Sequence, residues 1–114
     1  MPSAPGPSLA ATLEWAEHHA TEPLTVADLA VRARVSVATL HRHFRAELGC
    51  TPLAWLTARR LDQARRLLEA TDLPIERVAA ECGLGTTANL RTHLAAATGL
   101  TPTAYRAQFR ARTA

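Results

Sequence analysis

The chain contains an internal repeat of about 50 residues, and this repeat restricts the possible fold more than any other feature. Residues 24–35 recur 49 residues later as 73–84, and residues 40–55 recur 50 residues later as 90–105. The change of offset places one extra residue in the second copy. Self-similarity at such a spacing indicates two copies of one small structural unit.

Each copy has the same order of predicted elements: a short helix, a tight turn, a second helix, and a Gly-x-Thr-Pro sequence that opens a third. A short helix and a longer helix joined by about three residues form the helix-turn-helix unit. Apolar spacing and capping residues predict an all-α chain of about seven helices. We expect these helices to begin near residues 8, 25, 36, 51, 74, 86 and 101.

The predicted helices divide the chain into four segments: a flexible Pro-rich tail or linker remnant (1–7), a first helix-turn-helix unit (8–50), a connecting helix (51–72) and a second unit (73–114). A connecting helix of about 19 residues is roughly 28 Å long. One turn of DNA is roughly 34 Å long. Two recognition helices at the ends of such a helix would therefore match successive major grooves.

Several side chains are predicted to point into the core. On the helix that begins near residue 36 these are Val37, Leu40, Phe44 and Leu48, and the connecting helix runs through Leu53. His43 and His93 correspond across the repeat and precede apolar residues, so packing is expected of them more than DNA contact. The fifth helix is expected to end at Gly83.

Positive charge is concentrated in the middle of the chain. Residues 1–31 carry a net charge of −4, residues 32–66 carry +6, and residues 67–114 carry +1. Together with a pI near 9.7, this distribution is typical of a protein that binds a polyanion. A solvated helix surface is the alternative interpretation of the same charges.

Other classes of protein are disfavoured. No apolar stretch approaches the length of a membrane span, and the first residues do not resemble a secretory signal. Cys50 and Cys82 lie far apart, so neither a disulfide framework nor a cysteine zinc site is expected, and a cytoplasmic location follows. No histidine spacing indicates a metal site. No pair of side chains has the spacing of a catalytic centre, so we expect no enzyme activity and no cofactor.

Six motifs follow one another along the chain: Leu24-Thr25-Val26-x-x-Leu29-Ala30, Ser36-x-x-x-Leu40-x-Arg42-x-Phe44-Arg45, Gly49-x-Thr51-Pro52, Arg60-Leu61-x-x-Ala64-x-x-Leu67-Leu68, Ile75-x-x-Val78-Ala79-x-x-Cys82-Gly83-Leu84 and Gly99-x-Thr101-Pro102-x-x-Tyr105-Arg106. With these motifs the chain resembles the C-terminal double helix-turn-helix DNA-binding domain of AraC/XylS-type bacterial transcription regulators. The resemblance extends from about Leu9 to Phe109.

The resemblance implies a sequence-specific regulator that binds double-stranded DNA, with RNA polymerase as a further candidate partner. A domain of this kind is expected to be monomeric alone. The sequences of residues 22–26 and 89–93 look most like the branch of the family whose members carry an amidotransferase-like sensor domain upstream. This sequence does not contain that domain. The chain is therefore either a stand-alone regulator or an excised DNA-binding domain.

The same resemblance implies a role for particular side chains on the two recognition helices. Base-reading roles are predicted for Ala38, His41, Arg42, Thr87, Ala88, Arg91 and Thr92. Phosphate contacts are predicted for Ser36, Thr39, Arg45, Thr86 and Asn89. Arginine suits guanine O6 and N7, whereas alanine can contact only a thymine methyl group or a sugar.

The chain departs from the family pattern in the second copy. Leu84 and Leu94 replace phenylalanine, so less aromatic volume fills the core there. The end of the second recognition helix is Ala95-Ala96-Ala97, where relatives carry basic residues. The first unit is therefore expected to supply most of the attraction to phosphates, and the second unit to refine specificity.

Two other functions remain open from the sequence. The arginine content also fits a helical protein that binds nucleic acid without sequence preference, and exposed arginines also fit a helical protein-interaction module. Competition by unrelated DNA separates the first alternative from specific binding. A steep salt dependence of DNA affinity separates DNA binding from the second alternative, because a protein-interaction module predicts no such dependence.

Overall fold

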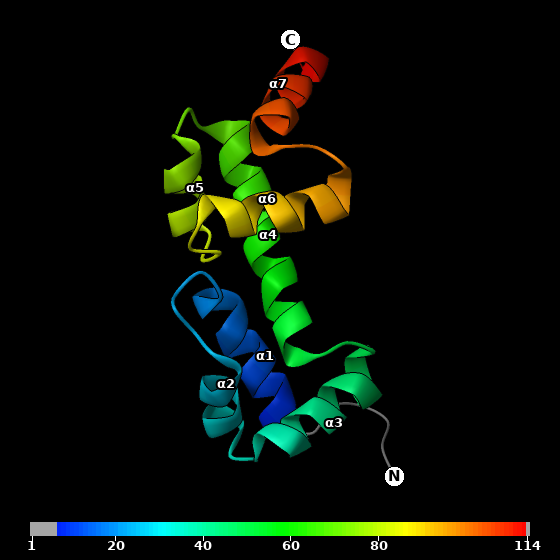
Figure 1. Cartoon of the computed structure of the whole chain (residues 1–114). Helices are drawn as coiled ribbons and strands as arrows, with labels where there is room; N and C mark the ends of the chain where they lie inside the picture. Colours follow the sequence, from blue (N-terminus) through cyan, green and yellow to red (C-terminus); the bar gives the residue numbers. More distant parts are fainter. Residues whose placement is uncertain (1–6, 114) are drawn as a thin grey trace. The chain divides into compact units, whose positions relative to one another are not determined.

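The computed structural model describes residues 7–113, which form seven α-helices and no strand (Figure 1). The helices are α1 (Pro7–His19), α2 (Val26–Ala33), α3 (Val37–Leu48), α4 (Pro52–Ala70), α5 (Ile75–Glu81), α6 (Thr87–Thr98) and α7 (Pro102–Thr113). The all-α prediction is confirmed. The expected tail lies outside the described residues apart from Pro7, which begins α1. None of these helices is long and apolar enough to cross a membrane.

Side-chain caps predicted from the sequence are present. The backbone N–H of Thr25 donates to Asp28 Oδ2 at 2.9 Å, and the N–H of Asp28 donates to Thr25 Oγ1 at 3.1 Å. This reciprocal pair is a capping box at the start of α2. Gly49 and Gly99 end α3 and α6 with φ values of 72° and 74°. Such caps need only residues within one helical turn, which is why the sequence predicts them.

The turn of the second copy is longer than expected. The predicted end of the fifth helix at Gly83 was wrong, because α5 ends at Glu81. Gly83 and Gly85 follow with φ values of 92° and 87°, which favour glycine. The amide Nδ2 of Asn89 donates to the carbonyl oxygen of Leu84 at 3.0 Å and so connects this turn to α6.

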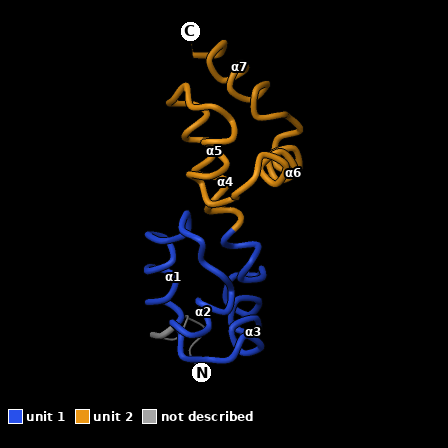
Figure 2. The backbone as a smooth tube through the Cα atoms, turned by 60° about the vertical axis from the view of Figure 1, so that its left-hand side comes forward, with its two compact units in different colours: residues 1–56 blue, residues 57–114 orange. Residues whose placement is uncertain are grey.

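The chain packs as two compact units, Met1–Leu56 and Thr57–Ala114, which Figure 2 colours separately. The boundary falls inside α4. Leu56 belongs to the first core, whereas Ala64 and Leu68 belong to the second. The sequence-based division treats residues 51–72 as a separate connecting helix, and the packing instead distributes α4 between the two units.

The core of the first unit holds α3 by one face. Leu40 and Phe44 of α3 are fully buried against Leu29 of α2 and Leu56 of α4. Phe44 meets the ring of Trp55 edge to face, with 6.3 Å between ring centroids. Because the apolar stripe of α3 is buried, the opposite face of this helix is turned outward.

The second unit repeats this arrangement. Leu90 and Leu94 of α6 are fully buried with Val78 of α5 and Leu68 of α4. α6 is therefore held through the face that corresponds to Leu40 and Phe44 in the first unit.

Helix α7 is attached to the C-terminal end of α4 by hydrogen bonds. Arg106 Nε donates to the carbonyl oxygen of Leu68 at 3.1 Å, and Arg110 Nη2 donates to that of Thr71 at 2.7 Å. Arg110 Nη1 also contacts Asp72 Oδ1 at 2.6 Å. Carbonyl oxygens at a helix C-terminus lack partners within the helix, so these arginines supply the missing donors.

Two apolar residues predicted to point inward are exposed instead, Val37 by 42% and Leu48 by 38%. Leu53 of α4 is also exposed, by 57%. Val37 and Leu48 are the first and last residues of α3, where the helix extends past the core. Leu53 lies about 100° around α4 from the buried Pro52, at the edge of the apolar face.

Candidate nucleic-acid interface

The first recognition helix, α3, begins at a serine cap. Ser36 has extended backbone angles, and its Oγ accepts the N–H of Thr39 at 3.1 Å. The predicted DNA-contacting side chains of this helix fall on its outward face. Ser36, Ala38, Arg42 and Arg45 are exposed, and Thr39 and His41 are half-buried. The fold therefore brings together all six residues predicted for the first unit.

The second recognition helix, α6, begins in the same way. Thr86 accepts the N–H of Asn89 at 3.1 Å through its Oγ1. The predicted residues again lie on the outward face. Thr86, Ala88, Asn89, Arg91 and Thr92 are exposed, and Thr87 is half-buried.

Several of these polar side chains already have hydrogen-bond partners inside the protein. The Asn89 amide donates to the Leu84 carbonyl, and Thr92 Oγ1 donates to the carbonyl oxygen of Ala88 at 3.0 Å. Arg42 Nη2 donates to Thr39 Oγ1 at 3.0 Å. Sequence reasoning missed this last bond, although residues three apart on a helix are neighbours and the spacing could have indicated it.

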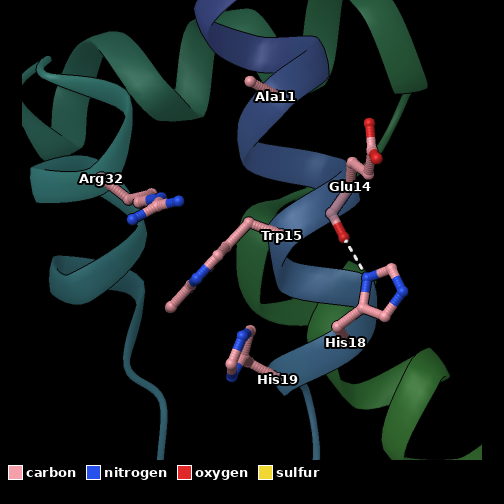
Figure 3. Close-up of a pocket in the computed structure, with 6 residues that line it drawn as sticks. All are labelled: Ala11, Glu14, Trp15, His18, His19 and Arg32. Atoms are coloured by element: carbon pink, nitrogen blue, oxygen red, sulfur yellow. Dashed lines mark hydrogen bonds between the residues drawn. The ribbon is translucent and has the colours of Figure 1, made fainter.

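Some arginines of the basic central segment are used for packing. In the first unit, a surface hollow of about 340 Å³ lies against α1 and is lined by Ala11, Glu14, Trp15, His18, His19 and Arg32 (Figure 3). The Arg32 guanidinium lies 4.8 Å from the centroid of the Trp15 ring, and His19 stacks on the same ring at 4.5 Å. A cation held over an indole ring stabilises the contact between α1 and α2. This cluster was not predicted from the sequence.

Arginines of the second unit are engaged in a similar way. Arg65 Nε donates to the hydroxyl of Tyr105 at 3.2 Å, and this bond raises the pKa of Arg65. The Tyr105 hydroxyl itself donates to the carboxylate of Glu69. Arg60 is partly buried near Cys82, and desolvation lowers its pKa. Arg77 pairs with Glu81 at 2.6 Å.

The outward face of α3 therefore carries two exposed arginines, Arg42 and Arg45, whereas that of α6 carries Arg91. Residues Ala95 and Ala96, which correspond to Arg45 and Ala46, are exposed and uncharged. This difference agrees with the charge imbalance between the two copies in the sequence. A cationic surface on a helix attracts phosphates without distinguishing bases.

The exposure of His43 differs from the prediction. Packing was predicted for His43 and His93, but His43 is exposed and only His93 is half-buried. His43 lies about 100° around α3 from Phe44 and about 60° from Leu40, so it lies at the edge of the buried stripe and its ring is exposed. Among residues 7–113, no group of three or more His, Cys, Asp or Glu side chains is placed to hold a metal ion.

Each unit places a capped helix after a short helix and a tight turn, which defines the class of helix-turn-helix proteins. A family model described as a helix-turn-helix domain matches residues 29–108. A model for bacterial regulatory proteins of the tetR family matches residues 9–46, which is less than half of the chain.

Similar solved structures indicate which family of helix-turn-helix proteins the chain belongs to. The DNA-binding domain of AdpA, a global transcriptional factor, in complex with a target DNA is 42% identical, with a TM-score of 0.87 and 96% of both chains covered. A transcriptional regulator from Chromobacterium violaceum described by its AraC-type DNA-binding domain is 31% identical, with a TM-score of 0.74 and coverage of 90% of this chain and 92% of that one. The chain belongs to the AraC-type family of helix-turn-helix DNA-binding domains.

Curated relatives are longer. The HTH-type transcriptional regulator CdhR of Pseudomonas aeruginosa is 43% identical over 67 residues, which are 59% of this chain and 20% of CdhR. The chain therefore spans about a fifth of the length of that relative.

Proposed function

We propose that this chain is the DNA-binding part of a transcription regulator and binds specific duplex sequences through α3 and α6. The observation that carries this proposal is the outward face of each helix, which presents exposed arginine beside small and hydroxyl side chains. The likeness to the DNA-bound AdpA domain supports it. A regulator of this kind acts on DNA in the bacterial cytoplasm, where we place the chain.

Base recognition is assigned to the N-terminal and central parts of the two helices. Arg42 and Arg91 each present a guanidinium that can bind O6 and N7 of guanine in the major groove. The methyl groups of Ala38 and Ala88 suit contact with thymine methyls. His41 can donate one hydrogen bond when neutral and two when protonated.

Threonine hydroxyls complete the proposed base-reading set. Thr87 and Thr92 on α6 can donate to or accept from several base edges, so they discriminate less sharply than an arginine.

Phosphate contacts are assigned chiefly to Arg45, the exposed cation farther along α3. Ser36 and Thr86 lie at the starts of the two helices, and Asn89 lies one turn after Thr86. Neutralising a phosphate releases a condensed counterion, so Arg45 contributes affinity for every duplex and a steeper salt dependence.

We further propose that one chain contacts two successive major grooves on one DNA face. Two unequal recognition helices predict an asymmetric site rather than a palindrome, and binding by a monomer. Footprinting of the selected site tests this: two protected segments about one turn apart are expected. A single short segment, or a palindrome bound by two chains, contradicts it. Because transcription regulators act at promoters, RNA polymerase is the second partner that we propose.

The decisive experiment selects bound sequences from a random duplex pool with the wild type, Arg42→Ala and Arg91→Ala. Each variant should lose preference at one base pair, and these pairs should lie in different segments of the site. The loss of discrimination at each should be about 1–3 kcal/mol. Selection of no consensus by the wild type would favour non-specific binding. No affinity for duplex DNA at low salt would favour a protein-interaction module.

A further inference from the structure

Three side chains on the outward face of α3 form a continuous hydrogen-bonded series. Ser36 Oγ accepts the backbone N–H of Thr39 at 3.1 Å and donates its own proton to Thr39 Oγ1 at 3.0 Å. Arg42 Nη2 donates to the same Thr39 Oγ1 at 3.0 Å. The hydroxyl of Thr39 thus connects the cap of the helix to the guanidinium of Arg42.

The spacing of these residues explains the series. Ser36, Thr39 and Arg42 follow one another at intervals of three, so their side chains lie along one edge of the first turns of α3. The bond to Thr39 uses one of the five N–H donors of the guanidinium. Four donors remain, and a bidentate contact with guanine needs two, so Arg42 can bind a base while Thr39 holds it.

The second recognition helix has a different arrangement at the matching positions. Asn89 corresponds to Thr39, but its amide Nδ2 donates to the Leu84 carbonyl in the longer turn. Arg91 is exposed and corresponds to His41. Within residues 7–113 the guanidinium of Arg91 has neither a hydrogen bond nor an ion pair. The arginine of the first helix is held in the free protein, and that of the second is not.

We propose that Thr39 is a positioning residue that orients Arg42 before DNA binds and so sharpens base discrimination by the first unit. This inference rests on the proposed base-reading role of Arg42. Binding through a long side chain costs rotamer freedom, and a side chain that is already oriented loses less on binding. The orientation also favours the base edge that lies in line with the guanidinium over other edges. The direct phosphate contact that the sequence predicts for Thr39 is a different role, with different consequences.

Thr39→Val separates the two roles, because valine keeps the branched shape and removes the hydroxyl. Affinity is measured for the selected duplex and for one altered at the base pair that responds to Arg42→Ala. If Thr39 orients Arg42, the affinity ratio of these two duplexes should fall roughly two- to tenfold, the range of one hydrogen bond. Affinity for unrelated duplexes should stay within about twofold. Thr39→Ser keeps the hydroxyl and should restore most of the ratio.

A double substitution tests the connection to Arg42 directly. In an Arg42→Ala background, Thr39→Val should cause no further loss of discrimination, since there is no guanidinium left to orient. An equal loss in both backgrounds, or equal weakening for every duplex, would overturn the positioning role in favour of a direct DNA contact. An unchanged affinity ratio in Thr39→Val would also overturn it.

Two further controls keep the result interpretable. Thr39→Ala removes the hydroxyl with a better helix former, so it should reproduce the Thr39→Val result if folding of the valine variant is impaired. Arg42→Ala alone distinguishes this inference from the proposed function. If it leaves base preference unchanged, base reading by Arg42 fails and the positioning role falls with it. If it changes base preference while Thr39→Val does not, only the positioning role fails.

Discussion

Arg34 and Gly83 occupy the same position in the two copies of the repeat, and both have left-handed backbone angles, with φ values of 60° and 92°. Arg34 is the C-cap of α2, and its N–H bonds to the carbonyl oxygens of Ala30 and Val31. A residue with a Cβ is strained in this conformation, whereas glycine is not. The tight turn of the first unit therefore stores strain that the second unit avoids.

Arg34→Gly should stabilise the protein by about 0.5–1 kcal/mol, which is the relief of strain less the greater freedom of glycine in the unfolded chain. Thermal or urea unfolding measures the gain. Arg34→Ala is the matched control, because it removes the same charge and keeps the strained conformation. Equal stability of the glycine and alanine variants would show that charge, not φ, sets the effect.

Arg45 and Ala95 also correspond across the repeat, and both are exposed. Arg45→Ala should weaken binding to all duplexes and flatten the salt slope by about 1. Ala95→Arg should do the opposite, tightening all binding and steepening the slope by about 1. Affinities at several salt concentrations test both changes. Failure of Ala95→Arg to strengthen non-specific binding at low salt, in a folded variant, would mean that α6 does not lie against DNA.

Leu56 and Leu53 provide a matched pair on α4. Leu56 is fully buried in the first core, whereas Leu53 is 57% exposed. Leu56→Ala should cost about 2–5 kcal/mol, since it removes buried methyl groups and leaves a cavity. Leu53→Ala should change the free energy of unfolding by less than about 0.5 kcal/mol. Comparable losses in chemical denaturation would contradict the assignment of Leu53 to the exposed surface.

The pair between Arg110 and Asp72 should make stability depend on pH. The hydrogen bond from Arg110 lowers the pKa of Asp72 in the folded state. A carboxylate with a lowered folded pKa stabilises the protein above its unfolded pKa, and this contribution is lost as pH falls through the folded value. Asp72→Asn should therefore be less stable than the wild type near neutral pH, by a small amount because Asp72 is exposed. The difference in stability between the wild type and Asp72→Asn should disappear as the pH falls.

Unfolding temperatures of both proteins between about pH 7 and pH 2 measure how this difference disappears. Arg110→Ala should give the same trend, since it removes the partner that lowers the pKa. A difference between wild type and Asp72→Asn that stays constant over this pH range would argue against the pair.

Much of the local structure could be predicted from the sequence. The repeat indicated two helix-turn-helix units, and the caps at Thr25, Ser36 and Thr86 lie where local signals placed them. The outward position of the proposed base-contacting residues also follows from helical periodicity. These features depend on residues within one or two helical turns, so a single sequence contains the information that decides them.

The tertiary structure alone decided which arginines stay available to a ligand. Residues 32–66 contain eight arginines. Packing then placed Arg32 over Trp15 and joined Arg65 to Tyr105, 40 residues away in the chain. Contacts of this kind form between elements far apart in sequence, where no local spacing signals them. The physical reason is that helix propensity and capping act along the chain, whereas burial and charge pairing act through space.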